Sequence, residues 1–450
     1  MLTPADYGSF DLFMVLAGIL NLTLPLEITQ GVARYYACEK DKSRKVGFAC
    51  TAFWFTFGVY ATFSLFAFVA TEFLSNIVLG QHGLESEFRI GVLYLFCTGL
   101  FNVVQNQFKW ELRGREYAIS AVLVAVCTAV SSTVFAYFLN WGLDGVLLGM
   151  FIGQFIGVSF GILRLRTSFP IRFDADRLWE MLRFSTPLVF SGITVWGNIY
   201  IDRISIKHLL SVNEVGLYAI GFRLSSLLLL LVAGFQGALT PLIYAHHADK
   251  ATPVHIEQLF RCFVCFTLIA YLTLALFAED IIRLVTTGPF HGGSDVVVFL
   301  APAMVLSNLY IFAPGISIAK KTHMFIWINA SGAIVNLALN LMLIPILGII
   351  GAALATLIGQ LTSFLIHMTV SQFYYKVPHE WPKLVVAVLI VAGFAYFIPQ
   401  FSLTFNARIQ LSIAAIISAG SLMLVLGLVR IEEIRQVFSH RKASQCDSVH

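Results

Sequence analysis

Residues 142–154 read GLDGVLLGMFIGQ, and residues 348–360 read GIIGAALATLIGQ. The two stretches align without gaps at an offset of 206 residues and are identical at six of their thirteen positions. Residues Leu2–Phe10 match Leu210–Tyr218 at nearly the same offset, 208 residues. Matches at a constant distance indicate an internal duplication, and a duplication decides the architecture of the whole chain.

The composition around these repeats is that of an integral membrane protein. Hydrophobic residues make up 58% of the 450 positions, charged residues only 12%, and the mean hydropathy is +0.82. A bilayer span needs roughly 20 apolar residues, and about thirteen such windows are present. They fall near residues 8–31, 47–69, 88–108, 117–139, 143–165, 184–208, 215–243, 259–284, 294–318, 324–346, 350–373, 383–402 and 407–429. The sequence therefore predicts an all-α polytopic membrane protein.

Lys and Arg give the predicted spans their orientation. They cluster on alternating connections, near residues 40–45, 109–115, 164–183 and 430–442, which identifies that side as cytoplasmic. The C-terminus is then cytoplasmic. In a membrane protein the sidedness of the basic residues matters more than the net charge of +4, and we expect no nucleic-acid partner. The basic turn Arg113–Tyr117 also repeats at Lys321–Phe325, so both copies have the same orientation. Such a parallel duplication predicts two pseudo-symmetric lobes around a central cavity.

The repeats also set the expected domain boundaries. We expect an N-terminal lobe at 1–166, a C-terminal lobe at 167–376, two additional spans at 377–430 and a cytoplasmic tail at 431–450. A whole span, 184–208, precedes the repeat at Leu210, whereas only Met1 precedes Leu2. We therefore expect the first helix of the N-terminal lobe to be missing from this sequence.

Polar residues inside the spans are the candidate functional residues, because ionisable groups are costly in a bilayer and usually face a cavity or a partner. Helical spacing places three stripes on single faces, and Arg223 lies within a further span. The stripes are Thr23, Glu27, Gln30 and Arg34; Asn102, Gln105, Lys109 and Arg113, with Asn106 adjacent; and Ser191, Thr194, Asn198 and Asp202, with Arg203 adjacent. Alternatively, the amides and hydroxyls only join helices by hydrogen bonds, and Asp202 with Arg203 forms a solvated pair at a span end.

The cations in this set favour an anionic cargo. Arg suits phosphate because its planar guanidinium donates two parallel hydrogen bonds. A carrier of cationic drugs would instead be expected to use acidic cavity residues, of which Glu27 is the main example.

No Walker loop, HExxH or GxSxG motif occurs, so we expect neither an enzyme nor a cofactor. Cys262 and Cys265 have CxxC spacing but lie in an apolar run, and no metal site is expected.

Six stretches, in order between spans, resemble the polysaccharide biosynthesis or O-antigen flippase family of the multidrug/oligosaccharidyl-lipid/polysaccharide exporter superfamily. They are LTPADYGSFDLF (residues 2–13), VARYY (32–36), LRGREYAI (112–119), LRFSTPLVFSG (182–192), IDR (201–203) and EVGLYAIGFRL (214–224). The resemblance implies fourteen spans and transport of a polyprenyl-diphosphate-linked oligosaccharide to the outer leaflet of a bacterial inner membrane by alternating access. It also implies a polysaccharide polymerase and a chain-length regulator as partner proteins.

Within this resemblance, we expect Arg34 and Arg223, with Lys109 and Arg113 near the cytoplasmic mouth, to hold the diphosphate, and amides and hydroxyls to contact sugar. The acidic Glu27 and Asp202 complete the expected cavity lining with Gln30, Gln105, Asn106, Asn198 and Arg203. Three other functions remain open: a cation-coupled multidrug antiporter of the same superfamily, a polysaccharide polymerase, and a membrane scaffold that transports nothing. The outer loops are too short for the polymerase, which is expected to carry a large one.

Overall fold

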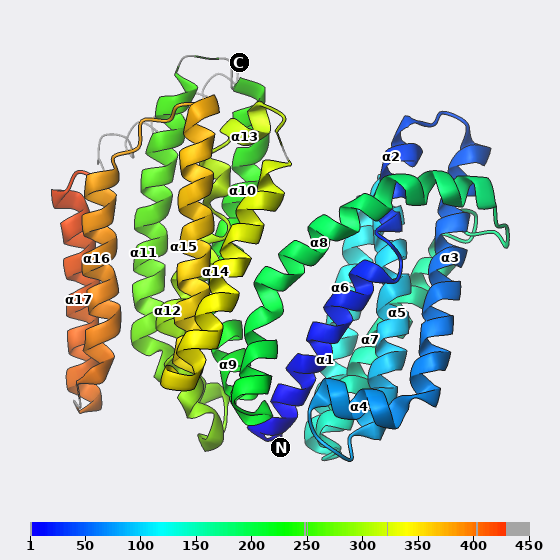
Figure 1. The fold of residues 1–450 in the computed structure, drawn as a ribbon, viewed down its shortest axis with the longest axis horizontal. Coiled ribbons are helices and arrows are strands. Elements are labelled where there is room, and N and C mark those ends of the chain that lie inside the picture. The colour runs from blue at the N-terminus through cyan, green and yellow to red at the C-terminus, as the bar shows by residue number, and fades with distance from the viewer. Residues whose placement is uncertain (1, 247–248, 250, 322, 402–403, 429–450) are drawn as a thin grey trace, which may run out of the picture. The chain divides into compact units, whose positions relative to one another are not determined.

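The computed structural model describes residues 2–246, 249, 251–321, 323–401 and 404–428, and the predicted tail at 431–450 lies outside them. The all-α class is confirmed, since the described residues form helices and no strand. The chain divides into two compact units, Met1–Ala219 and Ile220–His450, each described here by itself (Figure 1).

The first unit contains eight α-helices and the start of a ninth, α9. These are α1 (Pro4–Thr23), α2 (Ile28–Cys38), α3 (Lys42–Val69), α4 (Thr71–Leu79), α5 (Glu85–Trp110), α6 (Gly114–Thr133), α7 (Gly142–Arg164), α8 (Ala175–Leu209) and α9 (Val212–Ser225), with a π-helical turn, η1 (Val134–Phe138), after α6. Several helices begin at an oxygen-bearing cap, as the sequence dictates: Thr3 and Asp6 form a capping box on α1, and Asp174 caps α8.

The second unit continues from α9 to the C-terminus. Its helices are α10 (Leu228–His246), α11 (Thr252–Val285), α12 (Val297–Leu306), α13 (Gly315–Ile318), α14 (Met324–Leu347), α15 (Ile349–Tyr374), α16 (Trp381–Phe397) and α17 (Phe405–Val425). Three short 3₁₀ turns join them: η2 (Gly288–Ser294), η3 (Leu309–Phe312) and η4 (Ile398–Gln400).

Every predicted span coincides with one helix or with a short series of helices. Among the described residues, ten helices are long and apolar enough to cross a membrane, and two bent pairs raise the number to twelve. The predicted span at 184–208 lies in α8, which is not one of these twelve. This helix begins well before the predicted span and contains Pro187, which removes a backbone hydrogen bond within the helix.

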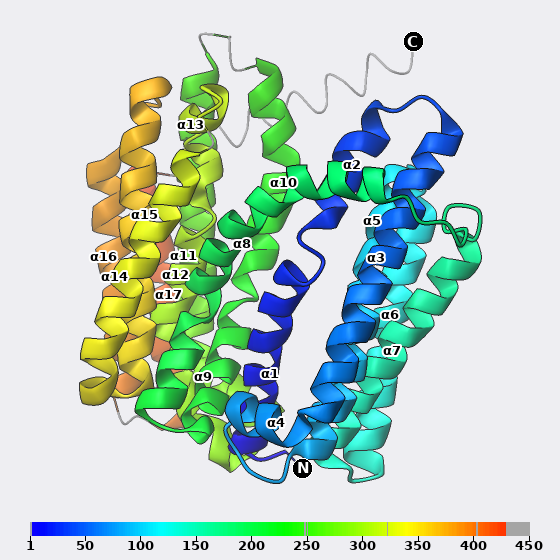
Figure 2. The ribbon, with the colours of Figure 1, turned by 45° about the vertical axis from the view of Figure 1, so that its right-hand side comes forward.

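The unit boundary differs from the expected lobe boundary. Residues 166 and 167 fall inside the first unit, and the division comes after Ala219. The reason is the packing of α8, which contacts α1, α2 and α3 of the first unit. Figure 2 shows α8 running beside α1.

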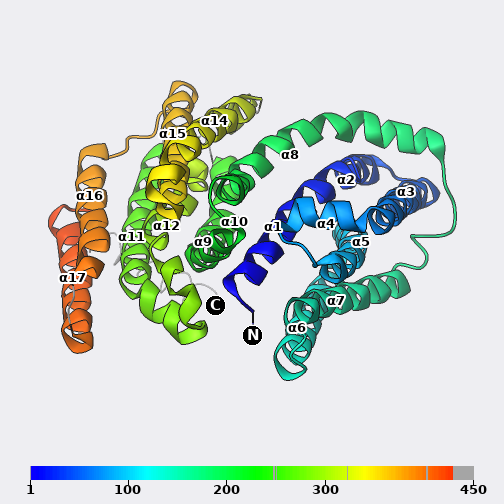
Figure 3. The same ribbon diagram turned by 60° about the horizontal axis from the view of Figure 1, so that its bottom comes forward.

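The duplicated stretches lie in equivalent helical hairpins, α6–α7 and α14–α15, and the two helices of each hairpin lie side by side (Figure 3). Gly142 and Gly348, aligned in the sequence, both have left-handed backbones, with φ of 55° and 63°. Small residues let the paired helices approach closely. A Cβ added to Gly149 would lie 2.2 Å from the Ser132 nitrogen, and one added to Gly359 would lie 2.8 Å from the Asn336 Cβ.

Candidate functional site

The first predicted span is interrupted, and the interruption positions the candidate site. Pro25 follows the last turn of α1, and Leu26 and Glu27 then have φ of 49° and 53° before α2 begins at Ile28. Two consecutive non-glycine residues in the left-handed region are strained, and such strain is concentrated at functional sites. Interrupted membrane helices are also where transporters place their binding sites.

Helix α8 lies against this interruption. Gly31 contacts Met181, since a Cβ on Gly31 would lie 2.9 Å from the Met181 Cβ, and Gly192 meets Leu22 in the same way at 2.4 Å. These two close approaches bring residues 184–187 of α8 opposite the break between α1 and α2. The break thus lies opposite the part of α8 that contains Pro187.

Two side chains on α8 shape the site. Ser185 is fully buried, and its hydroxyl has no hydrogen-bond partner in the described part of the chain. Phe184 lies beneath Arg34, whose guanidinium carbon is 4.3 Å from the centre of the ring. This cation–π contact holds the guanidinium in one place without neutralising its charge.

The predicted stripe on the first span is therefore the accessible, charged part of the site. Arg34 and Gln30 are exposed, and Glu27 is half-buried. Arg34 forms no ion pair with a carboxylate among the described residues. An exposed guanidinium beside a helix interruption can bind an anion through charge-assisted hydrogen bonds.

Asp202 and Arg203 lie elsewhere, inside the first unit. Both are 1% exposed. Arg203 Nε is 3.2 Å from the Asp11 carboxylate of α1, and Asp202 accepts a 2.8 Å hydrogen bond from the Tyr218 hydroxyl of α9. The pair is thus neither solvated nor accessible to a ligand, and it joins α1, α8 and α9.

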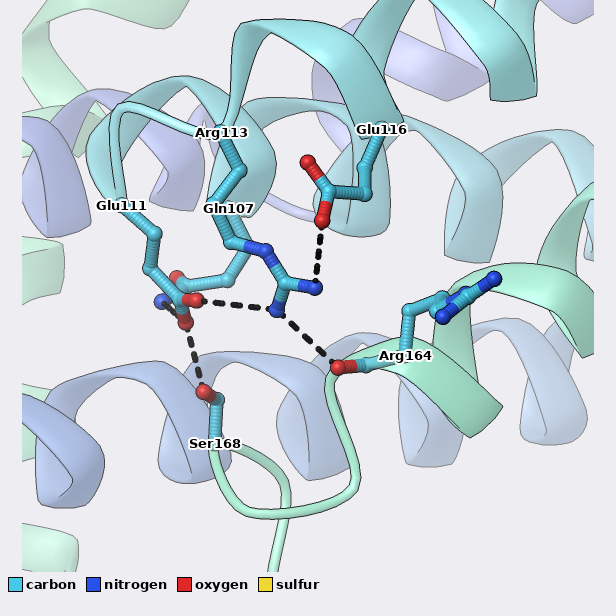
Figure 4. A network of polar contacts seen from close by, with 6 residues as sticks. All are labelled: Gln107, Glu111, Arg113, Glu116, Arg164 and Ser168. Carbon is cyan, nitrogen blue, oxygen red and sulfur yellow. Dashed lines mark hydrogen bonds and ion pairs between the residues drawn. The ribbon is translucent and has the colours of Figure 1, made fainter.

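Arg113 is part of a network at the turn between α5 and α6 (Figure 4). Its guanidinium donates to Glu116 at 2.9 Å and to the Arg164 carbonyl at 3.0 Å, and it is 3.5 Å from Glu111. The hydrogen bond to Glu116 raises the pKa of the Arg113 guanidinium. Glu111 also accepts from Ser168 at 2.5 Å. With its donors directed at the protein, Arg113 fixes the turn against the end of α7.

The neighbouring polar residues of α5 likewise bond within the unit. Gln105 donates to Ser120 of α6 at 2.7 Å. Asn106 donates to the Asn102 carbonyl at 2.9 Å and accepts from Lys109 at 3.4 Å. Lys109 is exposed and lies 5.2 Å from the centre of the Tyr117 ring. These contacts direct Lys109 toward α6, whereas Arg34 is directed toward α8.

Asn198 and Arg223 are the last two of the predicted site residues. Asn198 donates to the Thr194 carbonyl of its own helix at 3.3 Å. Arg223 is exposed near the end of α9, next to the 43° bend before α10. The structure thus brings Arg34, Gln30 and Glu27 together and separates them from Arg113 and from the Asp202–Arg203 pair.

Comparison with known proteins identifies the family. Residues 1–291 match the model of a family described as polysaccharide biosynthesis protein. The chain belongs to this family. It is also 22% identical over 246 residues to a protein of Haloferax volcanii named as a probable low-salt glycan biosynthesis flippase, Agl15. The chain spans about half the length of this curated relative, since the match covers 52% of the chain and 51% of the relative.

Comparison with solved structures identifies the fold of this member of the polysaccharide biosynthesis family. The lipid II flippase MurJ in an inward closed conformation matches with a TM-score of 0.67 and 13% identity, covering 93% of the chain and 96% of MurJ. An inward-facing multidrug resistance transporter of the MATE family also matches with a TM-score of 0.67, at 16% identity, covering 82% of the chain and 90% of that transporter. The chain therefore has the fold of the MurJ and MATE transporters, and the family match confirms the resemblance seen in the sequence.

Several site features of this family member escaped sequence reasoning. The stacking of Phe184 on Arg34 depends on the packing of α8 along α1 and α2, which no local pattern reveals. Pro187 was a usable signal, because a proline within an apolar run indicates an irregular helix. Asp11 was another, as a lone carboxylate in a span requires a partner. No three His, Cys, Asp or Glu side chains gather to form a metal site within the described ranges.

Proposed function

We propose that this protein is a flippase that moves a polyprenyl-diphosphate-linked oligosaccharide from the cytoplasmic to the outer leaflet of a bacterial inner membrane, for O-antigen or exopolysaccharide synthesis. The observation that carries the proposal is Arg34, an exposed cation on α2, the helix that follows the interruption of the first span; Phe184 holds it, and no carboxylate in the described chain pairs with it. The family assignment and the MurJ-like fold support it.

In this mechanism Arg34 binds the diphosphate. The guanidinium donates parallel hydrogen bonds to phosphate oxygens, and the interruption gives the headgroup access to polar backbone at the depth of the bilayer. Gln30 lies one turn before Arg34 on α2 and contacts the first sugar or the second phosphate. Arg223, exposed beside the bend in the second unit, is a second cation that can bind an anionic headgroup.

The contacts of the other cations give them roles different from that of Arg34. Arg113 and Arg203 are bonded to Glu116 and Asp11, so their role is to hold helices together. Lys109 remains exposed at the cytoplasmic end of α5, where it attracts the anionic headgroup before the headgroup reaches Arg34. The polyprenyl chain stays in the bilayer, so no large apolar cavity is required.

Flipping is measured in liposomes that contain the purified protein and a fluorescent polyprenyl-diphosphate-linked oligosaccharide. A membrane-impermeant quencher reports how much lipid reaches the opposite leaflet. Arg34→Gln and Arg223→Gln each slow flipping at least about tenfold, because each removes a charged hydrogen-bond donor. Arg166→Gln, which changes an exposed arginine after α7, keeps the wild-type rate.

Two results would reject the proposal. Wild-type flipping no faster than in protein-free liposomes would reject transport of this lipid. Equal rates for Arg34→Gln and the wild type would reject the diphosphate site. Efflux of cationic drugs driven by an ion gradient, without lipid flipping, would favour the multidrug antiporter.

A further inference from the structure

The two copies of the duplication differ at one helix. In the first unit α5 is continuous from Glu85 to Trp110. The matching segment of the second unit is divided into α12, η3 and α13, with breaks at Ser307–Asn308 and Ala313–Pro314. At an offset of 208 residues, these breaks correspond to the middle of α5. Pro314 contributes to the second break, because proline cannot donate a backbone hydrogen bond.

Neighbouring helices satisfy the backbone groups that the breaks release. The Asn308 carbonyl accepts a 3.2 Å hydrogen bond from Gln236 of α10, and the Ala313 carbonyl is 3.1 Å from His367 Nε2 of α15. The Gly315 nitrogen donates to Ser371 of α15 at 2.8 Å. The interruption is therefore a built feature supported by two helices, rather than a frayed end.

A cluster of side chains at this interruption is open to its surroundings. Tyr310 is 47% exposed, Ser307 is exposed and Asn308 is half-buried. Asn308 donates to the Ser307 hydroxyl at 2.8 Å. The Tyr310 ring is supported from behind by Phe325 and His367, whose ring centres are 6.4 and 6.2 Å away. The cluster thus presents a fixed aromatic ring beside an amide and a hydroxyl.

The position of the cluster along the span indicates water rather than lipid beside it. Tyr310 lies within the predicted span at 294–318, ten residues before the basic turn at Lys320. Irregular backbone and exposed polar side chains occur inside a span where they line a water-filled space. The corresponding residue of the first unit, Asn102, is also polar and exposed.

We propose that Gln236, Ser307, Asn308 and Tyr310 form a sugar-binding site for one ring of the transported glycan. A sugar ring has apolar C–H faces and hydroxyls around its edge. The Tyr310 ring is suited to the face. The Ser307 hydroxyl and the Asn308 amide nitrogen already donate to the Met304 carbonyl, so the Ser307 and Asn308 side-chain oxygens are suited to accept hydrogen bonds from the hydroxyls at the edge. No cation belongs to the cluster, so it fits the neutral glycan and not the diphosphate. The inference rests on the proposed transport of a lipid-linked oligosaccharide.

The test compares two lipids that differ only in the sugar. The protein, reconstituted in nanodiscs, is titrated with undecaprenyl diphosphate and with an undecaprenyl-diphosphate-linked disaccharide. Tyr310→Ala weakens binding of the disaccharide lipid on the order of tenfold and leaves undecaprenyl diphosphate unchanged, whereas Tyr310→Phe retains the ring and stays within about twofold. Tyr396→Ala removes a tyrosine of similar exposure, 45%, from α16 and changes neither affinity.

Ser307→Ala provides a second variant in case the loss of the Tyr310 ring prevents folding. It weakens binding of the disaccharide lipid about threefold. The site is disproved if the wild type binds both lipids equally, or if Tyr310→Ala weakens both to the same extent. A different result would show that the proposed transport itself is wrong. In that case Arg34→Gln would not change the affinity for undecaprenyl diphosphate.

Discussion

Leu112 and Lys320, 208 residues apart, have the same left-handed backbone conformation, with φ of 56° and 57°. The residues that follow them make the same hydrogen bond: the Arg113 nitrogen donates to the Phe108 carbonyl at 2.9 Å, and the Lys321 nitrogen donates to the Ile316 carbonyl at 3.0 Å. The duplication is thus visible in backbone geometry where the sequences have diverged. Glycine would adopt this conformation without strain, so both copies retain a strained turn.

The first prediction concerns that strain. Leu112 is 91% exposed, so replacing it removes little packing. Leu112→Gly raises the free energy of unfolding by up to about 1 kcal/mol, because glycine has no Cβ penalty at positive φ. Leu112→Val lowers it, since a β-branched side chain fits this region worst. Thermal unfolding in detergent measures the stability of both variants. If both substitutions changed the free energy of unfolding in the same direction, the backbone at Leu112 would not be strained.

The second prediction concerns the buried pair of Asp11 and Arg203. Asp11→Asn leaves the guanidinium without its carboxylate and destabilises the first unit by about 3–5 kcal/mol. Asp11→Leu combined with Arg203→Leu recovers part of that loss, because the two opposite buried charges are removed together. Unfolding in denaturant is the measurement. A double variant less stable than Asp11→Asn alone would show that the pair does more than balance charge.

The sequence predicted the helical class, the duplication and the membrane location because all three rest on repeated local patterns. Gln30 and Arg34 lie one turn apart on α2, as helical spacing predicts, but Glu27 lies in the break before α2, where helical spacing does not apply. The partners of Arg113 and Arg203 could not be predicted in this way. Glu116 is close in sequence, but Arg164 and Asp11 reach these arginines only through helix packing. A charge that appears available in a sequence is often already paired in the fold.

The third prediction concerns the close packing of α6 on α7. Gly153→Ala places a Cβ 2.0 Å from the Thr128 hydroxyl and forces the hairpin apart, which lowers the free energy of unfolding by about 1–3 kcal/mol. Gly58→Ala in α3 is the matched control, because nothing lies within 4 Å of its added Cβ, and it is neutral or slightly stabilising. Equal effects of the two substitutions on thermal unfolding would show that the hairpin tolerates separation.

The fourth prediction is a dependence of stability on pH at the connection between α15 and α16. Burial lowers the pKa of His379 to about 4, and its ring makes edge-to-face contacts with Phe260 and Trp381. The unfolded chain binds a proton at a higher pH than the folded one, so the contribution of His379 is complete above its ordinary value of 6.5. It is lost as the pH falls from 6.5 toward 4, by at most about 1.4 kcal/mol per pH unit.

His379→Phe keeps the aromatic packing and removes the titration. The variant therefore loses less stability than the wild type between pH 6.5 and 4, and the two have parallel curves above pH 7. Unfolding midpoints across this range are the measurement. A variant curve parallel to the wild type down to pH 4 would exclude His379 as the titrating group.

The fifth prediction separates the roles of Phe184 and Arg34 in anion binding. Phe184 touches the guanidinium but has no group that binds phosphate, so its effect must pass through Arg34. Phe184→Leu weakens binding of undecaprenyl diphosphate about two- to fivefold, which is the range of an exposed cation–π contact, and Phe184→Trp keeps the affinity. In a chain that already carries Arg34→Gln, Phe184→Leu has no further effect, because the guanidinium it positions is gone. The same loss in both backgrounds would mean that Phe184 acts on the lipid directly, through the polyprenyl chain.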